Sequence, residues 1–464
     1  MFANTGFLSF CRYAESADGT RTPSKHMKAW CPLSETELDD FLALRLLMGI
    51  DTKPHIREYW STDQLRRTPI FPNTMSRDRF DQLSQALHLE DNDGVRQDGD
   101  RIWKIRTIVD LLNDRCNTVY MPTQVITVDE SLWKFRGRLG FIQYNPCKRA
   151  RYGVKVYKLS TSEGKGAGYT SAFKIYTGQD KTSKQTNVSK KVVVDLMEMA
   201  GLFDKGYTLN TDNWYSSPEL FHYLQARKTN AVGTANMRRK WMPKESDMNL
   251  GKAKGSMARR STATGMLCVQ WVDKKVVTVL STCHTSQMTT VRNRRDQEMV
   301  KPRAVVDYNS GKKGVDLSDQ LAKSYPMSRK SSKWYKKIFF FLLDLVVVNA
   351  HAVHKILGGS LSQLDFRMEL VRGLLATGGA RPPHRSAQLR LAAPPSQARL
   401  TLPVTQEELD RQTGNHFPSR IEGGKYRRCH LCYKDDKTRK NTPTECLTCS
   451  VSLCTYGCFA RYHS

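Results

Sequence analysis

Polar and apolar positions alternate at helical spacing in the first part of the chain. Residues 34–49 ("SETELDDFLALRLLMG") place an apolar run behind a polar start. Ser34, followed by Glu37 three positions later, is the capping-box pattern that begins a helix. Shorter helices are predicted over residues 76–89 and 104–120. We therefore expect a helical region before the middle of the chain.

From residue 123 the pattern becomes that of strands. The runs "QVITVDES", "YGVKVYKLS" and "SAFKIYTG" are separated by turns rich in Gly, Ser and Lys. A helix over 189–203 and a fourth strand within 206–217 follow, and a second helix starts at Ser217-Pro218. Strands mixed with crossover helices predict an α/β fold with a mixed sheet that helices cover on both faces. An RNase H-like core has this order and carries acids at the ends of its first and fourth strands.

Four aspartates stand where phosphodiester chemistry would need them. Two divalent cations held by carboxylates can stabilise charge on the attacking and leaving oxygens of such a reaction. Asp129 is predicted to end the first strand and Asp212 the fourth. Asp316 and Asp319, in "GVDLSDQL", share one helix face. The alternatives are a turn residue at Asp129, an Asp-Asn turn at Asp212 and a helix N-cap at Asp316.

The charge of the chain points to a polyanionic partner. The 464 residues have a formal net charge of +28, whereas residues 1–100 alone carry net −4. Nucleic acid is the commonest partner of such a chain, and a ribosome-like or membrane-surface protein is the alternative. The longest apolar stretch, residues 338–350, is short for a membrane span and contains Asp344, so it predicts a buried helix and no membrane partner.

Half of the twelve cysteines lie close together near the C-terminal end. Two CxxC pairs separated by thirteen residues are typical of a zinc site, because each pair supplies two thiolates to one tetrahedral ion. The region offers seven candidate ligands. Two zinc ions need eight, and His430 or His416 could supply the eighth. The alternative is unligated cysteines in a disordered tail. The seven candidate ligands are Cys429, Cys432, Cys446, Cys449, Cys454, Cys458 and His463.

Several ordered blocks resemble those of the piggyBac family of DNA transposases. They are "VDESLWKFRGRLGFIQYNPCKRARYGVKVY", "GYTLNTDNWYSSPELFHYL", "YNSGKKGVDLSDQL" and "KWYKKIFFFLLDLVVVNA". The resemblance extends upstream to "YWSTD" and "MSRDRFDQL" and downstream to the terminal cysteines. It therefore covers nearly the whole chain, apart from residues 376–400 and the first thirty or so.

The resemblance implies an RNase H-like DDE/D core that uses Mg²⁺ or Mn²⁺. By matching motifs, Asp129, Asp212 and Asp316 take the catalytic positions and Asp319 an accessory fourth position. The implied reaction is nicking, hairpin formation and strand transfer on double-stranded DNA at TTAA target sites, carried out by a nuclear homodimer. Trp334 matches an aromatic position near the family's active site, where it could stack on an unpaired base. Core packing is the alternative for Trp334.

The resemblance also divides the chain into parts. It implies a split helical dimerisation and DNA-binding domain, a catalytic core with an insertion, and a terminal RING- or PHD-like zinc cross-brace that binds transposon ends. The predicted parts are 1–120 (helical), 121–236 (core), 237–302 (insertion), 303–325 (core), 326–400 (helical and linker) and 420–464 (zinc module). The predicted DNA-contacting residues, besides Trp334, are Arg136, Arg138, Lys148, Arg149, Arg238, Arg239, Lys240, Arg427 and Arg428.

Two departures from the family pattern suggest a second hypothesis. Lys312 and Lys313 stand before the glycine of "GVD", where family members usually have small or apolar residues. The long acidic start found in many members is also absent, which suggests a truncated or domesticated copy. The alternative function is therefore a catalytically silent DNA- or chromatin-binding protein.

Overall fold

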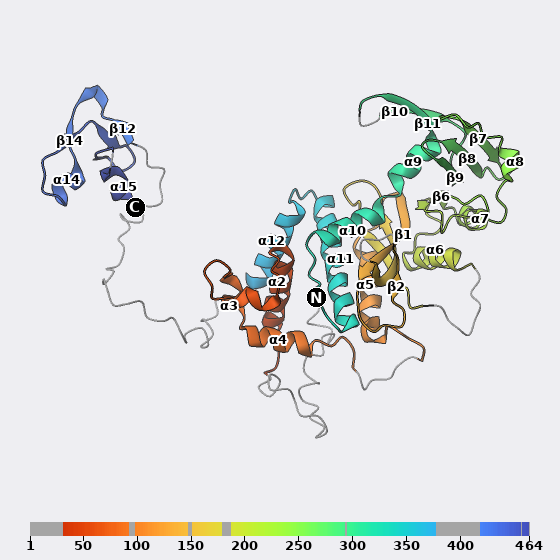
Figure 1. The fold of residues 1–464 in the computed structure, drawn as a ribbon, viewed down its shortest axis with the longest axis horizontal. Helices are drawn as coiled ribbons and strands as arrows, with labels where there is room; N and C mark the ends of the chain where they lie inside the picture. Colours follow the sequence, from red (N-terminus) through yellow and green to blue (C-terminus); the bar gives the residue numbers. More distant parts are fainter. Residues whose placement is uncertain are drawn as a thin grey trace, which may run out of the picture. The chain divides into compact units, whose positions relative to one another are not determined.

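The computed structural model divides the chain into two units, Met1–Leu389 and Arg390–Ser464, which are described separately (Figure 1). The predicted linker after Ala376, the histidine candidate His416 and the DNA-contact candidates Lys148 and Arg149 lie outside the described residues. The residues that the structure describes are 31–91, 98–146, 151–178, 187–292, 295–376, 418–455 and 457–463.

The predicted helices of the first part are present, and their core is completed by helices from much later in the chain. One apolar core combines residues 38–112 with residues 327–371. Ser34 caps the first helix by accepting a hydrogen bond from Glu37 N (3.1 Å). The Glu37 carboxylate does not close the capping box, because it is bound by Arg79 of a neighbouring helix. The helices are α2 (Glu35–Ile50), α3 (Ile70–Thr74), α4 (Arg77–Ala86), α5 (Arg106–Val119), α11 (Trp334–Ile356) and α12 (Gln363–Ala376).

Helix α11 contains the longest apolar stretch and lies inside this core. Among the described residues it is the one helix long and apolar enough to cross a membrane, and 67% of that stretch is buried within the protein. Asp344 is buried at its centre, accepts hydrogen bonds from Met327 N, and lies 3.7 Å from Arg367 Nη1 of α12. The predicted buried helix is therefore present, and its acid is paired.

The sheet has the mixed character that the sequence predicts. β1, β5 and β6 are parallel neighbours, β3 pairs antiparallel with the other edge of β1, and β4 pairs with β3. Side chains of β1 alternate between two cores: Ile126 and Val128 pack with α6 and α7, whereas Trp133 packs with α5 and α11. The strands and helices are β1 (Val125–Lys134), β2 (Gln143–Tyr144), β3 (Tyr152–Thr161), β4 (Thr170–Ile175), α6 (Val188–Met199), β5 (Thr208–Thr211), α7 (Pro218–Ala226) and β6 (Asn230–Thr234).

The segment predicted as an insertion continues the same sheet. β9 pairs antiparallel with β6, and β8 and β7 follow it outward. β8 and β9 form one hairpin of this segment, and β10 and β11 form a separate one. The elements are α8 (Glu245–Met248), β7 (Met257–Ser261), β8 (Leu267–Val272), β9 (Val276–Ser281), β10 (Met288–Arg292) and β11 (Glu298–Pro302).

Helices α9 (Arg303–Gly311) and α10 (Gly314–Ser324) return the chain to the sheet (Figure 1). A Cβ on Gly311 would lie 2.4 Å from the Asn210 side chain of β5. A Cβ on Gly314 would lie 2.7 Å from the Thr161 carbonyl oxygen of β3. Because real Cβ contacts are longer than this, these two glycines allow α10 to rest directly on the sheet.

The terminal unit is small and has a core of cysteines. Its apolar interior is formed mainly by six cysteines together with Leu431, Leu453 and Phe459. The elements are β12 (Pro418–Arg420), η5 (Glu422–Gly424), β13 (Arg427–Arg428), α14 (His430–Lys434), β14 (Asn441–Thr442), β15 (Thr444–Cys446), β16 (Val451–Ser452) and α15 (Cys458–His463).

We predict that Gly314→Ala destabilises the protein by about 1–3 kcal/mol, because the new methyl group meets backbone that cannot turn away. Gly373→Ala is the matched control: this glycine lies inside α12 and a Cβ there meets nothing within 4 Å. The control should be neutral or stabilising by roughly 0.5–1 kcal/mol. Denaturant unfolding measures both, and equal effects of the two substitutions would contradict the close packing of α10.

Candidate active site and metal centre

The parallel pairing of β1 with β5 brings two aspartates together. Val128 pairs with Thr211 in the last register position of these strands, and the next residue on each is Asp129 and Asp212. Ligand oxygens of Asp129, Glu130 and Asp212 all lie within 4.8 Å of one another. The prediction that β1 ends at Asp129 is wrong: β1 continues to Lys134 along β3, and it is β5 that ends.

Asp129 lies in an environment that disfavours its charged form. Burial raises the pKa of its carboxyl to about 7, and the charges of Glu130, Asp212 and Asp316 act in the same direction. One hydrogen bond, from Glu130 N to Asp129 Oδ1 (2.8 Å), opposes this shift without cancelling it. The site therefore gathers more negative charge than its own hydrogen bonds compensate, which is the property of a cation-binding site.

Asp212 combines the predicted turn with the predicted site. Trp214 N donates to its Oδ1 (2.9 Å), which is the Asp-Asn turn considered from the sequence. The Ser216 hydroxyl donates to its backbone carbonyl (2.8 Å). These bonds fix the turn that holds the Asp212 carboxylate within reach of Asp129.

Asp316 lies in the first turn of α10, over the same edge of the sheet. The helix cap is Lys313, so the alternative role of Asp316 as N-cap is not what the structure shows. The Asp316 side chain is exposed, and its charge acts on Asp129. Lys312 and Lys313, the departures from the family pattern, are exposed residues at the junction of α9 and α10.

Asp319 lies one helical turn later and has other partners. Lys158 of β3 and Lys323 of α10 form ion pairs with it at 2.9 and 2.8 Å. Burial opposes ionisation of this carboxyl, but the two ammonium groups outweigh burial and lower its pKa to about 2. Asp319 is thus not among the three acids whose ligand oxygens converge.

The predicted DNA-contacting residues of the first unit differ in whether their side chains are exposed or hydrogen-bonded within the protein. Arg136 and Arg138 are exposed, as are Arg238 and Lys240. Arg239 instead donates to the carbonyl oxygens that follow Asp212, those of Asn213 (3.0 Å) and Trp214, and so braces the turn of the site.

Trp334 is half-buried and is therefore closer to the packing alternative. Its ring lies edge-on to that of Phe141 at 5.8 Å, at the start of α11. Its predicted role in stacking on DNA stays a prediction.

The sequence did not single out Glu130 and Lys158, which belong to the surroundings of this site, or Trp241, which lies on the exposed surface after β6. Glu130 joins the carboxylate group, and only its position next to Asp129 could have indicated this. Lys158 was hidden in an apolar strand. Trp241, 72% exposed with φ 71° and with Lys240 Nζ 4.8 Å from its ring centre, lies among the basic residues after β6. An exposed indole beside cations is typical of a nucleic-acid surface.

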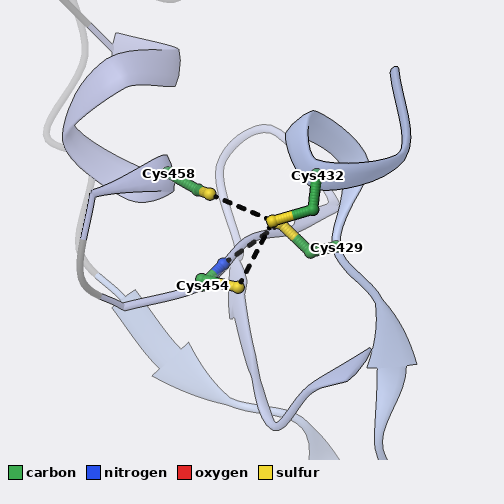
Figure 2. A group of neighbouring side chains, drawn as sticks. All are labelled: Cys429, Cys432, Cys454 and Cys458. Atoms are coloured by element: carbon green, nitrogen blue, oxygen red, sulfur yellow. Dashed lines mark hydrogen bonds between the residues drawn. The ribbon is translucent and has the colours of Figure 1, made fainter. Parts of the chain in front are cut away.

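In the terminal unit, four thiols converge on one point (Figure 2). Cys432 Sγ lies 3.9 Å from Cys454 Sγ and 3.5 Å from Cys458 Sγ, and Cys429 completes the set. Four sulfurs bound tetrahedrally at 2.3 Å from zinc stand about 3.8 Å apart, so the thiols fit this ion.

A second group consists of Cys446, Cys449 and His463. His463 Nδ1 lies 2.8 Å from the Phe459 carbonyl oxygen, which leaves Nε2, 3.5 Å from Cys449 Sγ, facing the group. The first and third cysteine pairs therefore form one site, and the second pair with the histidine forms the other, as in a cross-brace. His430 packs against Tyr462 and belongs to neither group.

Comparison with known proteins identifies the family. A family model described as transposase IS4 matches residues 12–351. The chain belongs to this transposase family. It is 27% identical over 445 residues to the human "PiggyBac transposable element-derived protein 3", covering 93% of this chain and 70% of that protein. It is 24% identical over 334 residues to the human "PiggyBac transposable element-derived protein 2", covering 70% of this chain and 56% of that protein.

The fold of this transposase-family chain also matches a solved structure. A cryo-EM structure of a piggyBac transposase synaptic complex with hairpin DNA superposes with a TM-score of 0.68 at 21% identity, covering 96% of this chain and 91% of that one. The resemblance to piggyBac-type transposases is confirmed.

We predict that Asp129 makes the metal-free protein less stable as pH rises. A folded-state pKa near 7 lies above the unfolded value of about 3.9, so the folded protein keeps a proton that the unfolded chain has lost. The free energy of unfolding should therefore fall between about pH 4 and pH 7. In EDTA at pH 8, Asp129→Asn should unfold roughly 2–4 °C above wild type, which corresponds to ~1 kcal/mol.

The control for this measurement is Asp114→Asn, at an exposed position of α5. It should keep the wild-type dependence on pH. If the thermal unfolding temperatures of wild type and Asp129→Asn depended on pH in the same way, the raised pKa of Asp129 would be contradicted.

Proposed function

We propose that the chain is a piggyBac-type DNA transposase that cuts and joins phosphodiester bonds at the edge of the sheet where Asp129 and Asp212 converge, with Asp316 supplied by the first turn of α10. The observation that carries the proposal is the convergence of the β1 and β5 acids, although they come from two distant parts of the chain. The strand order β4-β3-β1-β5-β6, with β3 alone antiparallel to the others, is that of an RNase H-like core, and it supports this assignment.

The donor set suits a hard divalent cation. Mg²⁺ and Mn²⁺ are held by a few carboxylates that leave room for water and phosphate oxygens. When bound, such an ion would stabilise charge on the attacking and leaving oxygens. Within the chain, Asp129 and Asp212 are fixed by the strands and Asp316 by α10, so the carboxylates need little rearrangement to accept it.

Each step of the proposed reaction breaks one P–O bond and forms another. Water attacks a phosphorus at the transposon end, the 3′ oxygen leaves, and a free 3′-OH and a 5′-phosphate result. The 3′-OH attacks a phosphodiester of the opposite strand to form a hairpin and displaces a 3′ oxygen there. After water has opened the hairpin, the 3′-OH attacks target DNA at TTAA. Each transesterification exchanges one P–O bond for another and needs no external energy source.

The terminal unit is proposed to bind two zinc ions and transposon-end DNA. Exposed Arg427 and Arg428 stand directly before Cys429, and an open hollow beside them is lined by His430 and Tyr433. Cations next to an aromatic ring suit phosphates and bases. Double-stranded DNA is therefore the proposed partner, with a homodimer in the nucleus as the working form.

One observation favours the second candidate, a silent DNA- or chromatin-binding protein. Asp319, the accessory position in the resemblance, is bound by two lysines. The catalytic test below separates the two functions.

We predict that the purified full-length chain contains about two zinc ions. Cys432→Ser should remove one, because it breaks the four-thiolate site, and Cys449→Ser should remove the other. Cys268→Ser, at a buried cysteine of β8, is the matched control and should keep both. Elemental analysis measures the content, and a wild-type chain without zinc would contradict the module.

We predict that Asp129→Asn, Asp212→Asn and Asp316→Asn each lower cleavage of a TTAA-flanked end by at least about 100-fold, the scale for loss of one group that stabilises developing charge. Binding of duplex DNA should remain, since lysine and arginine supply it. The assay uses Mg²⁺ and an end sequence taken from the flanks of the gene.

Asp114→Asn should cut like wild type in this assay. Cleavage surviving in Asp129→Asn would contradict the assigned site. Wild-type protein that binds such ends and never cuts them would favour the silent DNA-binding function.

A further inference from the structure

The carboxylate of Asp319 is fully occupied by partners within the protein. Lys158 Nζ lies 2.9 Å from Oδ1, and Lys323 Nζ lies 2.8 Å from Oδ2. The Ser131 hydroxyl of β1 donates a further short hydrogen bond to Oδ1. Both oxygens are engaged and the negative charge is compensated before a cation approaches.

Lys158 makes this arrangement hard to undo. Its side chain is 1% exposed, it lies opposite Asp129 in the β1–β3 register, and its ammonium also donates to Ser318 Oγ (2.9 Å). A buried ammonium without an anion is strongly disfavoured. A divalent cation that bound Asp319 would remove that anion from Lys158 and add a second positive charge next to it. Asp319 is therefore a poor ligand in this chain.

The same contacts fix α10 on the sheet. Ser318 Oγ lies 3.0 Å from Thr170 Oγ1 of β4, which in turn lies 3.1 Å from Ser160 Oγ of β3. Asn349 of α11 bonds both backbone groups of Thr170 at 2.9 Å. This network connects α10 to β3, β4 and α11. Asp316 lies one helical turn before Asp319 on α10.

Glu130 has the opposite properties. Its carboxylate is within reach of the ligand oxygens of Asp129 and Asp212. Its ion pair with Lys155 is long, at 3.8 Å, because the Lys155 ammonium lies 4.7 Å from the Trp214 ring centre and 4.9 Å from that of Tyr157. Lys155 can remain over these two rings when Glu130 turns toward a cation.

We propose that Glu130, and not Asp319, supplies the fourth carboxylate of the cation site, and that Asp319 is a positioning residue which Lys158 holds so that α10 presents Asp316. This inference rests on the proposed function, since it concerns the same site. The family resemblance gave the accessory fourth position to Asp319 and implied no role for Glu130.

The test is Mn²⁺ binding by the full-length chain, with free Mn²⁺ followed by electron paramagnetic resonance. Glu130→Gln should weaken Mn²⁺ binding about tenfold or more, as expected when a group that contacts a metal ion or orients its ligands is lost. The double variant Lys158→Met/Asp319→Asn removes both charges of the buried pair and should bind Mn²⁺ more tightly than either Asp319→Asn or Asp129→Asn, because it neither loses a direct ligand nor buries an unpaired ammonium group.

The single variant Asp319→Asn separates positioning from ligation. It leaves Lys158 buried without its anion, so its thermal unfolding temperature and its Mn²⁺ affinity should both fall. Both should recover in the double variant, which still lacks the Asp319 carboxylate. A ligand role for Asp319 does not allow that recovery.

Two results would overturn the proposal. One is a double variant that is as weak in Mn²⁺ binding as Asp129→Asn. The other is wild-type affinity in Glu130→Gln. A wild-type chain that binds no Mn²⁺ would instead contradict the cation site of the proposed function, and the inference with it.

Discussion

The parallel pairing of β1 with β5 is the constraint on which the active site depends. Val128 and Thr211 occupy the last position paired between these two strands, so Asp129 and Asp212 follow it side by side, although β1 itself continues along β3. Because side chains alternate along a strand, a slip of one residue would turn each acid to the opposite face. The apolar residues before them hold the register: Ile126, Val128 and Leu209 are fully buried in one core with α6 and α7. The packing of this core therefore fixes the relative positions of the Asp129 and Asp212 carboxylates.

The third acid depends on a different kind of contact. Gly311 and Gly314 let α10 approach backbone and side chains of the sheet more closely than any other residue would allow. The buried Lys158–Asp319 pair then fixes the helix at its second turn. Stability is lost where these elements meet, because burial and neighbouring carboxylates raise the pKa of Asp129. Such a local conflict between charge and burial is expected where function, not folding, has selected the residues.

Much of this arrangement is predictable from the sequence, because it follows from local pattern. The change from helical to strand spacing near residue 123, the Ser217-Pro218 helix start and the buried stretch of α11 are all local features, and all are present. The spacing of the cysteines indicated metal sites, but their interleaving was implied only by the family resemblance, since the two CxxC pairs lie in different groups.

The features that were missed depend on contacts between distant residues. The end of β1 could not be read from Asp129, because β3 continues to pair with β1 beyond the point where β5 stops. The i, i+3 spacing of Asp316 and Asp319 correctly put both on α10 but could not show that Lys158, 161 residues from Asp319, would occupy one of them. Trp241 is one tryptophan among eight in the sequence, and only its exposure distinguishes it.

The most direct measurement of the central claim is anomalous scattering from Mn²⁺ in crystals of the full-length protein. The account predicts a peak beside the carboxylates of Asp129 and Asp212, which would hold the ion. A peak elsewhere in the chain, with the Asp129 and Asp212 carboxylates bound only to protein or water, would contradict it.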